Sequence, residues 1–130
     1  MPKYTIQPVS TGSFAEAEAS LLYYARTPDQ EPVAALRRLG LAPADVDVVI
    51  NTHLHWDHCH SNHLFPKATI RVQADEIVEA MNPLPAHRGL YAPLHADPPW
   101  ARVIQKTVPV KGDAEICPGV RVHALLLIAE

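Results

Sequence analysis

Residues 46–58 read VDVVINTHLHWDH, and this stretch decides the fold. Its first five residues are almost all apolar and predict a β-strand whose two faces are covered by other elements. Three histidines and an aspartate follow within six positions, at His53, His55, Asp57 and His58. Alternate residues at a strand end share a face, so His53 and His55 can point to one place. If the chain then turns into a helix, Asp57 and His58 lie just beyond them.

These four side chains are of the types that bind zinc. Neutral imidazole and carboxylate are common zinc ligands, with bonds of about 2.0–2.2 Å. A single histidine is more often a surface residue or a hydrogen-bonded core residue. Four potential ligands within six residues, directly after an apolar strand, rarely arise by accident. The sequence therefore predicts a metal site at His53, His55, Asp57 and His58.

The motif resembles the H-x-H-x-D-H signature of the metallo-β-lactamase superfamily. Further stretches are similar to the N-acyl-homoserine lactonase-like branch of that superfamily, namely residues 48–59, 62–66, 68–73, 82–89 and 112–122. The resemblance covers about residues 31–123, most of the chain. It implies an α+β fold of the αββα type, a mixed sheet with covering helices. The chain resembles about half of this sandwich, as a single partial domain over residues 1–130.

The resemblance also implies an activity. In this family two zinc ions share a hydroxide, which attacks a lactone or ester carbonyl at neutral pH, and the ions stabilise the developing oxyanion. The family would place zinc on His53, His55, Asp57 and His58, and Asp57 is also the candidate general acid for the leaving alkoxide. The expected function is a zinc-dependent metallo-hydrolase that opens a small-molecule lactone or ester. Its lactonase-like branch implies quorum quenching.

The chain departs from the family pattern at both ends. The family has an Asp-Thr-Gly strand before the helix that leads to the motif, and a Thr-Pro-Gly-His motif after Gly-Val-Arg-Val. Here residues 123–130 read HALLLIAE, and the bridging aspartate and last histidine of the family have no counterpart. Catalytic zinc normally has three protein ligands, whereas this motif offers two to each of two ions. We therefore expect partial zinc occupancy and weak or lost turnover; all four ligands on one ion is the alternative.

A second hypothesis comes from another class of protein. The chain could be a non-catalytic half-domain that forms a homodimer, or complements a partner chain, through an exposed sheet edge. A plain structural zinc module fits less well, because structural sites usually have closed four-ligand sets of cysteine and histidine.

Composition narrows the classes further. The chain has 130 residues, so we expect one domain at most, and its 48% hydrophobic content is ordinary for a globular protein. The net charge of −3, with scattered lysine and arginine, argues against a nucleic-acid partner. The N-terminus has no signal-peptide pattern and no stretch reaches the length of a membrane span. Two cysteines form no disulfide framework, so we expect a cytoplasmic protein without membrane association.

Local patterns predict the remaining elements. Ser13 and Glu16 have the form of a capping box and predict a helix to about Ala25, whereas the resemblance to the family would place a loop or strand there. A second helix is expected to begin at Asp29 as its N-cap, with Pro32 in its first turn and a buried stripe of Ala35, Leu36 and Leu39 before Gly40. A third helix is expected to bury Ala74, Ile77, Val78 and Met81. The predicted strands comprise residues 3–9, 46–50, 69–72, 103–110 and 120–127.

Overall fold

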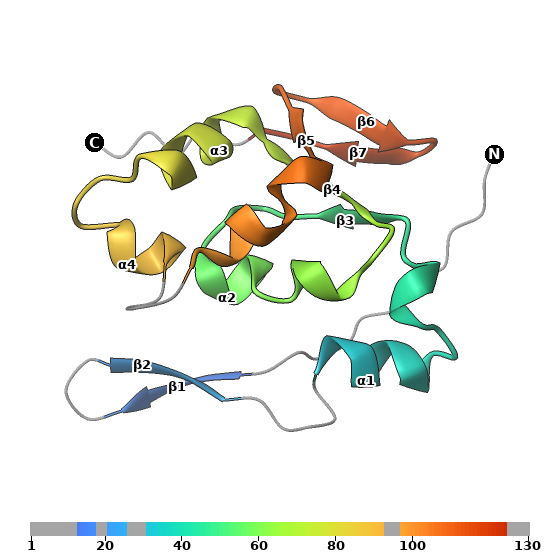
Figure 1. The fold of residues 1–130 in the computed structure, drawn as a ribbon, viewed down its shortest axis with the longest axis horizontal. Coiled ribbons are helices and arrows are strands. Elements are labelled where there is room, and N and C mark those ends of the chain that lie inside the picture. Colours follow the sequence, from blue (N-terminus) through green and yellow to red (C-terminus); the bar gives the residue numbers. More distant parts are fainter. Residues whose placement is uncertain (1–12, 18–20, 26–30, 93–96, 125–130) are drawn as a thin grey trace. The chain divides into compact units, whose positions relative to one another are not determined.

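The structure, a computed structural model, describes residues 13–17, 21–25, 31–92 and 97–124. The chain divides into two compact units, one of residues 3–45 and the other of residues 46–130 together with the first two residues. Figure 1 labels the helices and strands of both units. The single domain over residues 1–130 stays a prediction.

The first unit contains a β-hairpin where the sequence predicts a helix. Strands β1 (Ser13–Ala17) and β2 (Leu21–Ala25) pair antiparallel, with Ser13 opposite Ala25 and Ala17 opposite Leu21. The prediction of a helix over residues 13–25 is therefore wrong. The run Leu-Leu-Tyr-Tyr at 21–24 is rich in residues that suit strands, and cross-strand pairing outweighed the near-helical spacing of a few apolar residues. The strand predicted at 3–9 lies outside the described residues.

Helix α1 (Pro32–Arg38) follows, close to the predicted position. Pro32 occupies its first turn, where a missing N–H costs nothing. The N-cap is Glu31 rather than the predicted Asp29, which lies outside the described residues. Gly40 ends the helical segment with a φ of 75°. Of the predicted stripe Ala35 is buried, but Leu39 is 39% exposed, so that part of the prediction is wrong.

The second unit is built on a three-stranded parallel sheet. Its strands are β3 (Val48–Ile50), β4 (Thr69–Gln73) and β5 (Thr107–Val110), in the spatial order β3-β4-β5. Because crossovers between parallel strands are right-handed, two successive crossovers in one direction put their helices on the same face of the sheet. Figure 1 shows the connecting helices in sequence between these strands.

The helices of these crossovers meet around one side of β4. They are α2 (Trp56–Cys59), η3 (Asn62–Leu64), α3 (Ala74–Met81), α4 (Arg88–Tyr91) and η4 (Pro99–Lys106). The main core cluster comprises Leu54, Cys59, Val72, Ala80 and Tyr91, with Ile77 and Trp100 packed against it. Val72 and Ile70 share a face of β4 and are almost fully buried. Leu54 of the histidine motif belongs to this core, which attaches the motif to the sheet and the helices.

The prediction that both faces of the motif's strand are covered is wrong. Strand β3 begins at Val48 rather than at position 46, and it is an edge strand of the described sheet. Val48 is 37% exposed and Ile50 is 42% exposed. In a parallel sheet, residues in register share a face, so these two lie on the same side as Arg71 of β4 and Val108 of β5. The helices cover the opposite side.

Two further predictions need correction. Residues 103–106 belong to the 3₁₀ helix η4, so the strand predicted at 103–110 begins only at Thr107, whose hydroxyl donates to the carbonyl of Val103 at 2.9 Å. Helix α3 has its predicted bounds, but Val78 and Met81 are 68% and 70% exposed. Its buried stripe runs through Ile77 and Ala80 instead. At 3.6 residues per turn, Ile77 and Ala80 lie on one face and Val78 lies beside it. The strand predicted at 69–72 is confirmed as β4.

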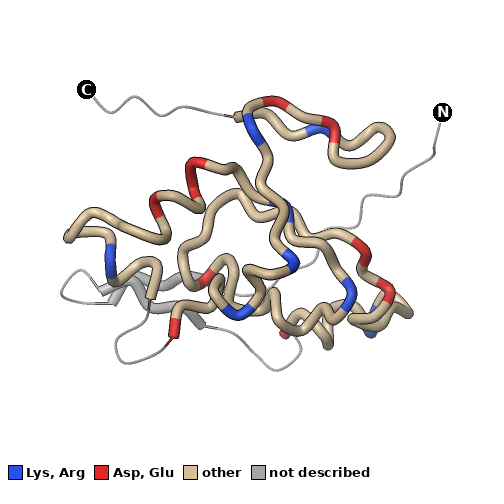
Figure 2. The backbone as a smooth tube through the Cα atoms, turned by 45° about the horizontal axis from the view of Figure 1, so that its top comes forward, with Lys and Arg blue, Asp and Glu red and all other residues tan. Residues whose placement is uncertain are grey.

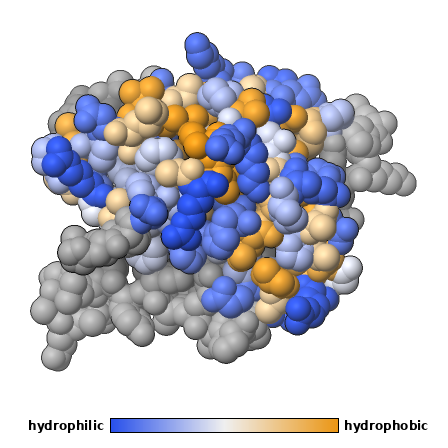
Figure 3. All heavy atoms as spheres, viewed as in Figure 1, coloured by the Kyte–Doolittle hydropathy of each residue, from blue (hydrophilic) through white to orange (hydrophobic). Residues whose placement is uncertain are grey.

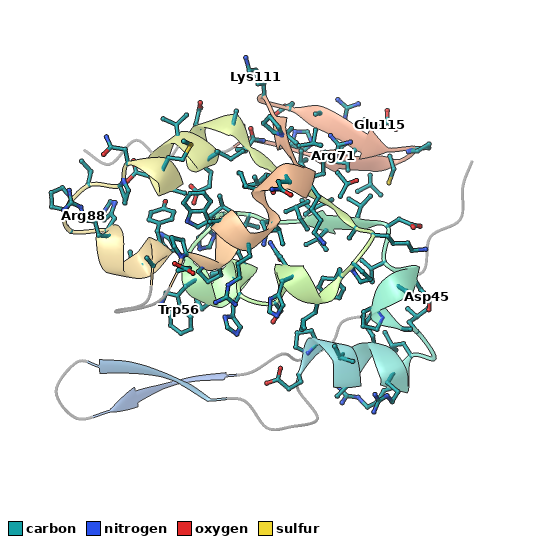
Figure 4. The ribbon with its side chains drawn as sticks, viewed as in Figure 1. Asp45, Trp56, Arg71, Arg88, Lys111 and Glu115 are labelled. Atoms are coloured by element: carbon teal, nitrogen blue, oxygen red, sulfur yellow. The ribbon has the colours of Figure 1, made fainter. Side chains whose placement is uncertain are left out.

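A second hairpin packs beside the end of the sheet. Strands β6 (Ala114–Cys117) and β7 (Val120–Val122) pair antiparallel around Gly119, which has a φ of 85°. The side-chain amide of Gln73 donates to the carbonyl of Gly112 at 2.9 Å and accepts from its N–H at 3.1 Å, which fixes the turn before β6. The strand predicted at 120–127 is confirmed to Val122, and residues 125–130 lie outside the described part. A cavity of about 350 Å³ lies at this end of the sheet and is lined by residues 50–52, 71–73, 110 and 122–124. Figure 4 labels Arg71, one of these residues.

Charged and apolar residues of the described chain are interspersed in the views of Figures 2 and 3. Figure 2 shows acidic and basic residues interspersed along the described chain. In the view of Figure 3, small apolar areas alternate with hydrophilic ones. Within the described ranges, no helix has both the length and the apolar character needed to cross a membrane.

Candidate metal centre

The backbone that leads into the motif is held by two buried asparagines. Beyond the end of β3, Asn51 donates its backbone N–H to the carbonyl of Arg71 at 2.8 Å, so the ladder with β4 extends by one bond. The Asn51 side chain donates to the carbonyl of His58 at 3.2 Å and accepts from the side-chain amide of Asn62 at 2.7 Å. Asn51 therefore joins the sheet, the short helix α2 and the loop beyond it. The motif therefore begins next to a residue whose backbone and side chain are both held by hydrogen bonds.

The motif then turns back on itself through α2. His55 is the N-cap of this helix, and its carbonyl accepts hydrogen bonds from the backbone N–H groups of His58 at 3.0 Å and of Cys59 at 3.1 Å. Leu54 and Cys59 point into the core, and the Cys59 thiol donates to the carbonyl of Leu54 at 3.3 Å. Figure 4 shows Trp56 at the start of the helix. Leu54 is buried, whereas the histidines on either side of it are only partly buried.

Three imidazole rings of the motif gather in one place. The ring of His53 lies 4.5 Å from that of His55, edge to face, and 3.9 Å from that of His58, measured between ring centroids. His53 is thus the middle member of the cluster. The expectation that His53 and His55 point to one place agrees with this arrangement, although both follow the strand rather than belong to it.

Asp57 lies beside the same cluster. Its Oδ2 is 3.5 Å from Nε2 of His58, and its side chain is only 18% exposed. His58 therefore approaches both His53 and Asp57, so the motif forms one connected group rather than two separate ligand pairs. The division of the four side chains between two ions, and the roles of the residues as ligands, stay predictions.

Burial and neighbouring rings favour the neutral form of His53 by lowering its pKa. Desolvation lowers the pKa of His53 below its ordinary value of 6.5, and the nearby imidazoles of His58 and His55 lower it further. The carboxylates of Glu76 and Asp57 act in the opposite direction with smaller effects. A neutral imidazole is the form that binds a metal ion. The environment of His53 thus favours the ligating state.

Glu76 and Tyr91 also contact the motif, and sequence reasoning did not single out Glu76. Glu76, in the first turn of α3, accepts a hydrogen bond from the backbone N–H of Leu54 at 2.8 Å. The ring of Tyr91 packs edge to face on that of His55 at 4.9 Å. These contacts span 22 and 36 positions of sequence. No local pattern connects such distant residues, and only the run of acidic residues opening α3 could have pointed to Glu76.

The other described histidines lie apart from the motif cluster. His63 is exposed and donates from Nδ1 to the carbonyl of His60 at 2.9 Å, as expected of a histidine that faces solvent or caps a carbonyl. His87 pairs with Glu79 at 3.4 Å and His123 with Asp113 at 3.0 Å. His95 lies outside the described residues.

The side chains of the motif are of types that bind zinc, but their ligand atoms are not arranged around one point. Imidazole and carboxylate groups are present together, one imidazole is held neutral, and the rings are close. Yet in residues 31–92 and 97–124, no group of three or more histidine, cysteine, aspartate or glutamate side chains is arranged to hold a metal ion. Ring rotations about the side-chain bonds, or further donors, are needed before three ligand atoms converge.

Comparison with known proteins identifies the class. The sequence profile of the metallo-β-lactamase superfamily matches residues 9–126. This match spans most of the chain and agrees with the α+β architecture and with the H-x-H-x-D-H motif at the end of β3. The chain therefore belongs to the metallo-β-lactamase superfamily.

Individual relatives indicate which branch of the superfamily the chain resembles. The chain is 31% identical over 110 residues to the N-acyl homoserine lactonase AiiA of Bacillus thuringiensis subsp. kurstaki, covering 85% of this chain and 39% of the relative. Over 44 residues it is 48% identical to a probable metallo-hydrolase of Methanocaldococcus jannaschii, covering 34% of this chain and 22% of that one. A solved N-acyl homoserine lactone hydrolase, with N-hexanoyl-L-homoserine bound at its catalytic metal centre, superimposes with a TM-score of 0.58. This structure is 29% identical, covers 77% of the present chain and is itself covered to 36%. The chain thus spans well under half the length of these relatives, and its likeness is to the lactonase-like branch.

Proposed function

We propose that the motif binds zinc and serves the hydrolysis of a small-molecule lactone or ester. The ligands are His53, His55, Asp57 and His58. The observation that supports this most strongly is the convergence of the three imidazole rings, with centroids 3.9 and 4.5 Å apart, beside a largely buried carboxylate. Zinc held by such residues supplies an activated water for attack on a carbonyl.

The chain's own residues have separate parts in this proposal. The hydrogen bond between Thr52 Oγ1 and Nδ1 of His53, at 2.9 Å, occupies one ring nitrogen and leaves Nε2 for the ion. Asp57 would pass a proton from the attacking water to the leaving alkoxide. The substrate class follows from the relatives, which are named N-acyl homoserine lactonases; a role in quorum quenching belongs to the same proposal. Free thiols at Cys59 and Cys117 agree with a cytoplasmic location.

Zinc binding and ring opening test this function together. The metal-free protein would be titrated with Zn²⁺ against a chromogenic chelator, and the opening of N-hexanoyl-L-homoserine lactone followed by the acid it releases. We expect zinc binding that is weakened in His53→Ala and unchanged in His60→Ala, whose ring lies outside the cluster. Any zinc-dependent turnover should fall in Asp57→Asn. Unchanged zinc binding in His53→Ala would place the ion elsewhere.

Self-association is the second candidate, and one observation favours it. Val48, Ile50 and Val108 share a face of the sheet and are 37, 42 and 40% exposed. A second copy of the chain would cover such a face in a homodimer. Sedimentation velocity of the wild type and of Ile50→Lys tests this: a dimer that dissociates in the variant supports it, and a monomeric wild type rejects it.

A further inference from the structure

We propose that Glu76 is a positioning residue that fixes the directions of His53 and His55, through its hydrogen bonds to the backbone of Leu54 and to Tyr91. Only the final step, the consequence for zinc, rests on the proposed function. The geometric part concerns the metal-free chain.

The first contact is to the peptide between the two histidines. The carboxylate oxygen Oε1 of Glu76 lies 2.8 Å from the backbone nitrogen of Leu54, which donates its proton. Leu54 is 2% exposed, so without Glu76 its N–H would be a buried donor cut off from water. Fixing this peptide plane fixes the chain on both sides of it. The side chains of His53 and His55 leave the chain directly before and after Leu54.

The second contact acts on His55 through the ring of Tyr91. Tyr91 is 4% exposed and presents its ring to that of His55, at a centroid distance of 4.9 Å and an angle of 84°. Burial first, and then the side-chain hydrogen bond to Glu76, raises the pKa of the Tyr91 hydroxyl. Glu76 therefore acts on His55 twice, through the Leu54 peptide and through the Tyr91 ring.

Glu76 is itself well anchored. It lies in the first turn of α3, where the helix dipole favours a carboxylate. One residue later Ile77 packs against the core, and Ala80 of the next turn is part of it. The carboxylate is thus presented from a helix that the core holds in place.

Metal-free protein gives the first test, by amide hydrogen exchange and NMR. Glu76→Ala should speed the exchange of the Leu54 amide by about tenfold or more, as expected for loss of one hydrogen bond to a charged acceptor. The ring-current shift of the His55 ring protons by Tyr91 should also change. Glu76→Gln keeps an acceptor oxygen and should stay close to wild type. The matched control is Glu79→Ala, one turn along α3, whose carboxylate contacts Leu84 and His87 instead.

Zinc titration of the same variants gives the second test. Glu76→Ala should weaken Zn²⁺ binding by about 10- to 100-fold, the usual cost of losing a residue that orients a ligand. Glu76→Gln should restore most of the affinity, and Glu79→Ala should leave it unchanged. A purely structural effect would lower the unfolding midpoint without this pattern of rescue.

The outcomes separate the two proposals. Unchanged Leu54 exchange and His55 shifts in Glu76→Ala, or equal effects in Glu79→Ala, would overturn the positioning role. Should Glu76→Ala fail to fold, Glu76→Gln decides, because a loss of Leu54 protection there would also contradict the hydrogen-bond mechanism. A wild-type chain that binds no zinc would refute the proposed function, and the exchange data would still decide the role of Glu76.

Discussion

The side-chain amide of Asn62 donates a hydrogen bond to the side-chain oxygen of Asn51 at 2.7 Å, and both residues are buried. This bond ties the 3₁₀ turn after the motif to the end of the strand before it. Asn51 in turn donates to the carbonyl of His58. The two asparagines therefore hold the segment that contains the motif in a defined conformation. The stability and the geometry of the motif depend on their side-chain amides.

Removing the Asn62 amide should destabilise the fold. Asn62→Ala leaves the Asn51 oxygen buried without this donor, which costs about 1–3 kcal/mol. Urea unfolding of the metal-free protein measures the difference. The neighbouring His63→Ala, at an exposed position, should change the free energy of unfolding by less than about 0.5 kcal/mol. Equal stability of the two variants would show that the asparagine pair contributes little.

His55 and His63 should differ in their importance for zinc. His55 lies in the ring cluster, whereas His63 bonds a backbone carbonyl outside it. His55→Ala should therefore lower zinc affinity by more than about tenfold, since a ligand matters at least as much as a residue that orients one. His63→Ala should lower it little. A greater loss at His63, found by titration with Zn²⁺, would mean that the site has been assigned to the wrong residues.

Cys59 should be inert in the folded protein. Burial raises the pKa of its thiol to about 11, so at pH 8 almost none of it is the reactive thiolate. Cys117 is partly exposed. A disulfide reagent at pH 8 should titrate one thiol in the native protein and two in urea. Rapid reaction of both thiols in the native protein would contradict the packing of Cys59 beneath the motif. So would reaction of Cys59 at urea concentrations too low to unfold the protein.

The metal-free protein should lose stability as the pH falls below about 6.5, the ordinary pKa of histidine. Because the pKa of His53 is lowered in the folded state, the unfolded chain binds a proton that the folded chain does not. The stabilisation is therefore present above pH 6.5 and declines below it. Urea unfolding from pH 7.5 to 5.5, compared with His53→Gln, isolates this contribution. A variant with the same pH dependence as the wild type would reject it.

Helix α3 offers a test of its buried face. Ile77 packs against the core, whereas Val78 is 68% exposed. Ile77→Ala should lower the free energy of unfolding by about 1–3 kcal/mol, and Val78→Ala by less than about 0.5 kcal/mol. Thermal or urea unfolding gives both values. Similar losses in the two variants would instead match the face that the sequence pattern predicted, on which both residues are buried.

Local chemistry was enough to predict several elements of this protein. Pro32 and Gly40 bracket α1, and the β-rich run at 69–72 and the amphipathic run before Pro83 became β4 and α3. The motif of His53, His55, Asp57 and His58 was apparent because its chemistry lies within six consecutive positions. Each of these signals depends on neighbours in sequence, and so does the membership of the superfamily that they indicated.

Tertiary contacts decided the rest. Strands β1 and β2 pair because they satisfy each other's backbone groups, a choice that apolar spacing does not specify. The exposure of Val48 and Ile50 follows from the place of β3 at the edge of the described sheet, not from their hydrophobicity. Glu76 and Tyr91 reach the motif across many positions of chain, and their selection depends on how α3 and α4 pack against β4. Sequence alone placed the histidines and the aspartate of the motif together, whereas packing decided which distant residues contact them, because hydrogen bonds and ring contacts depend on distance in space.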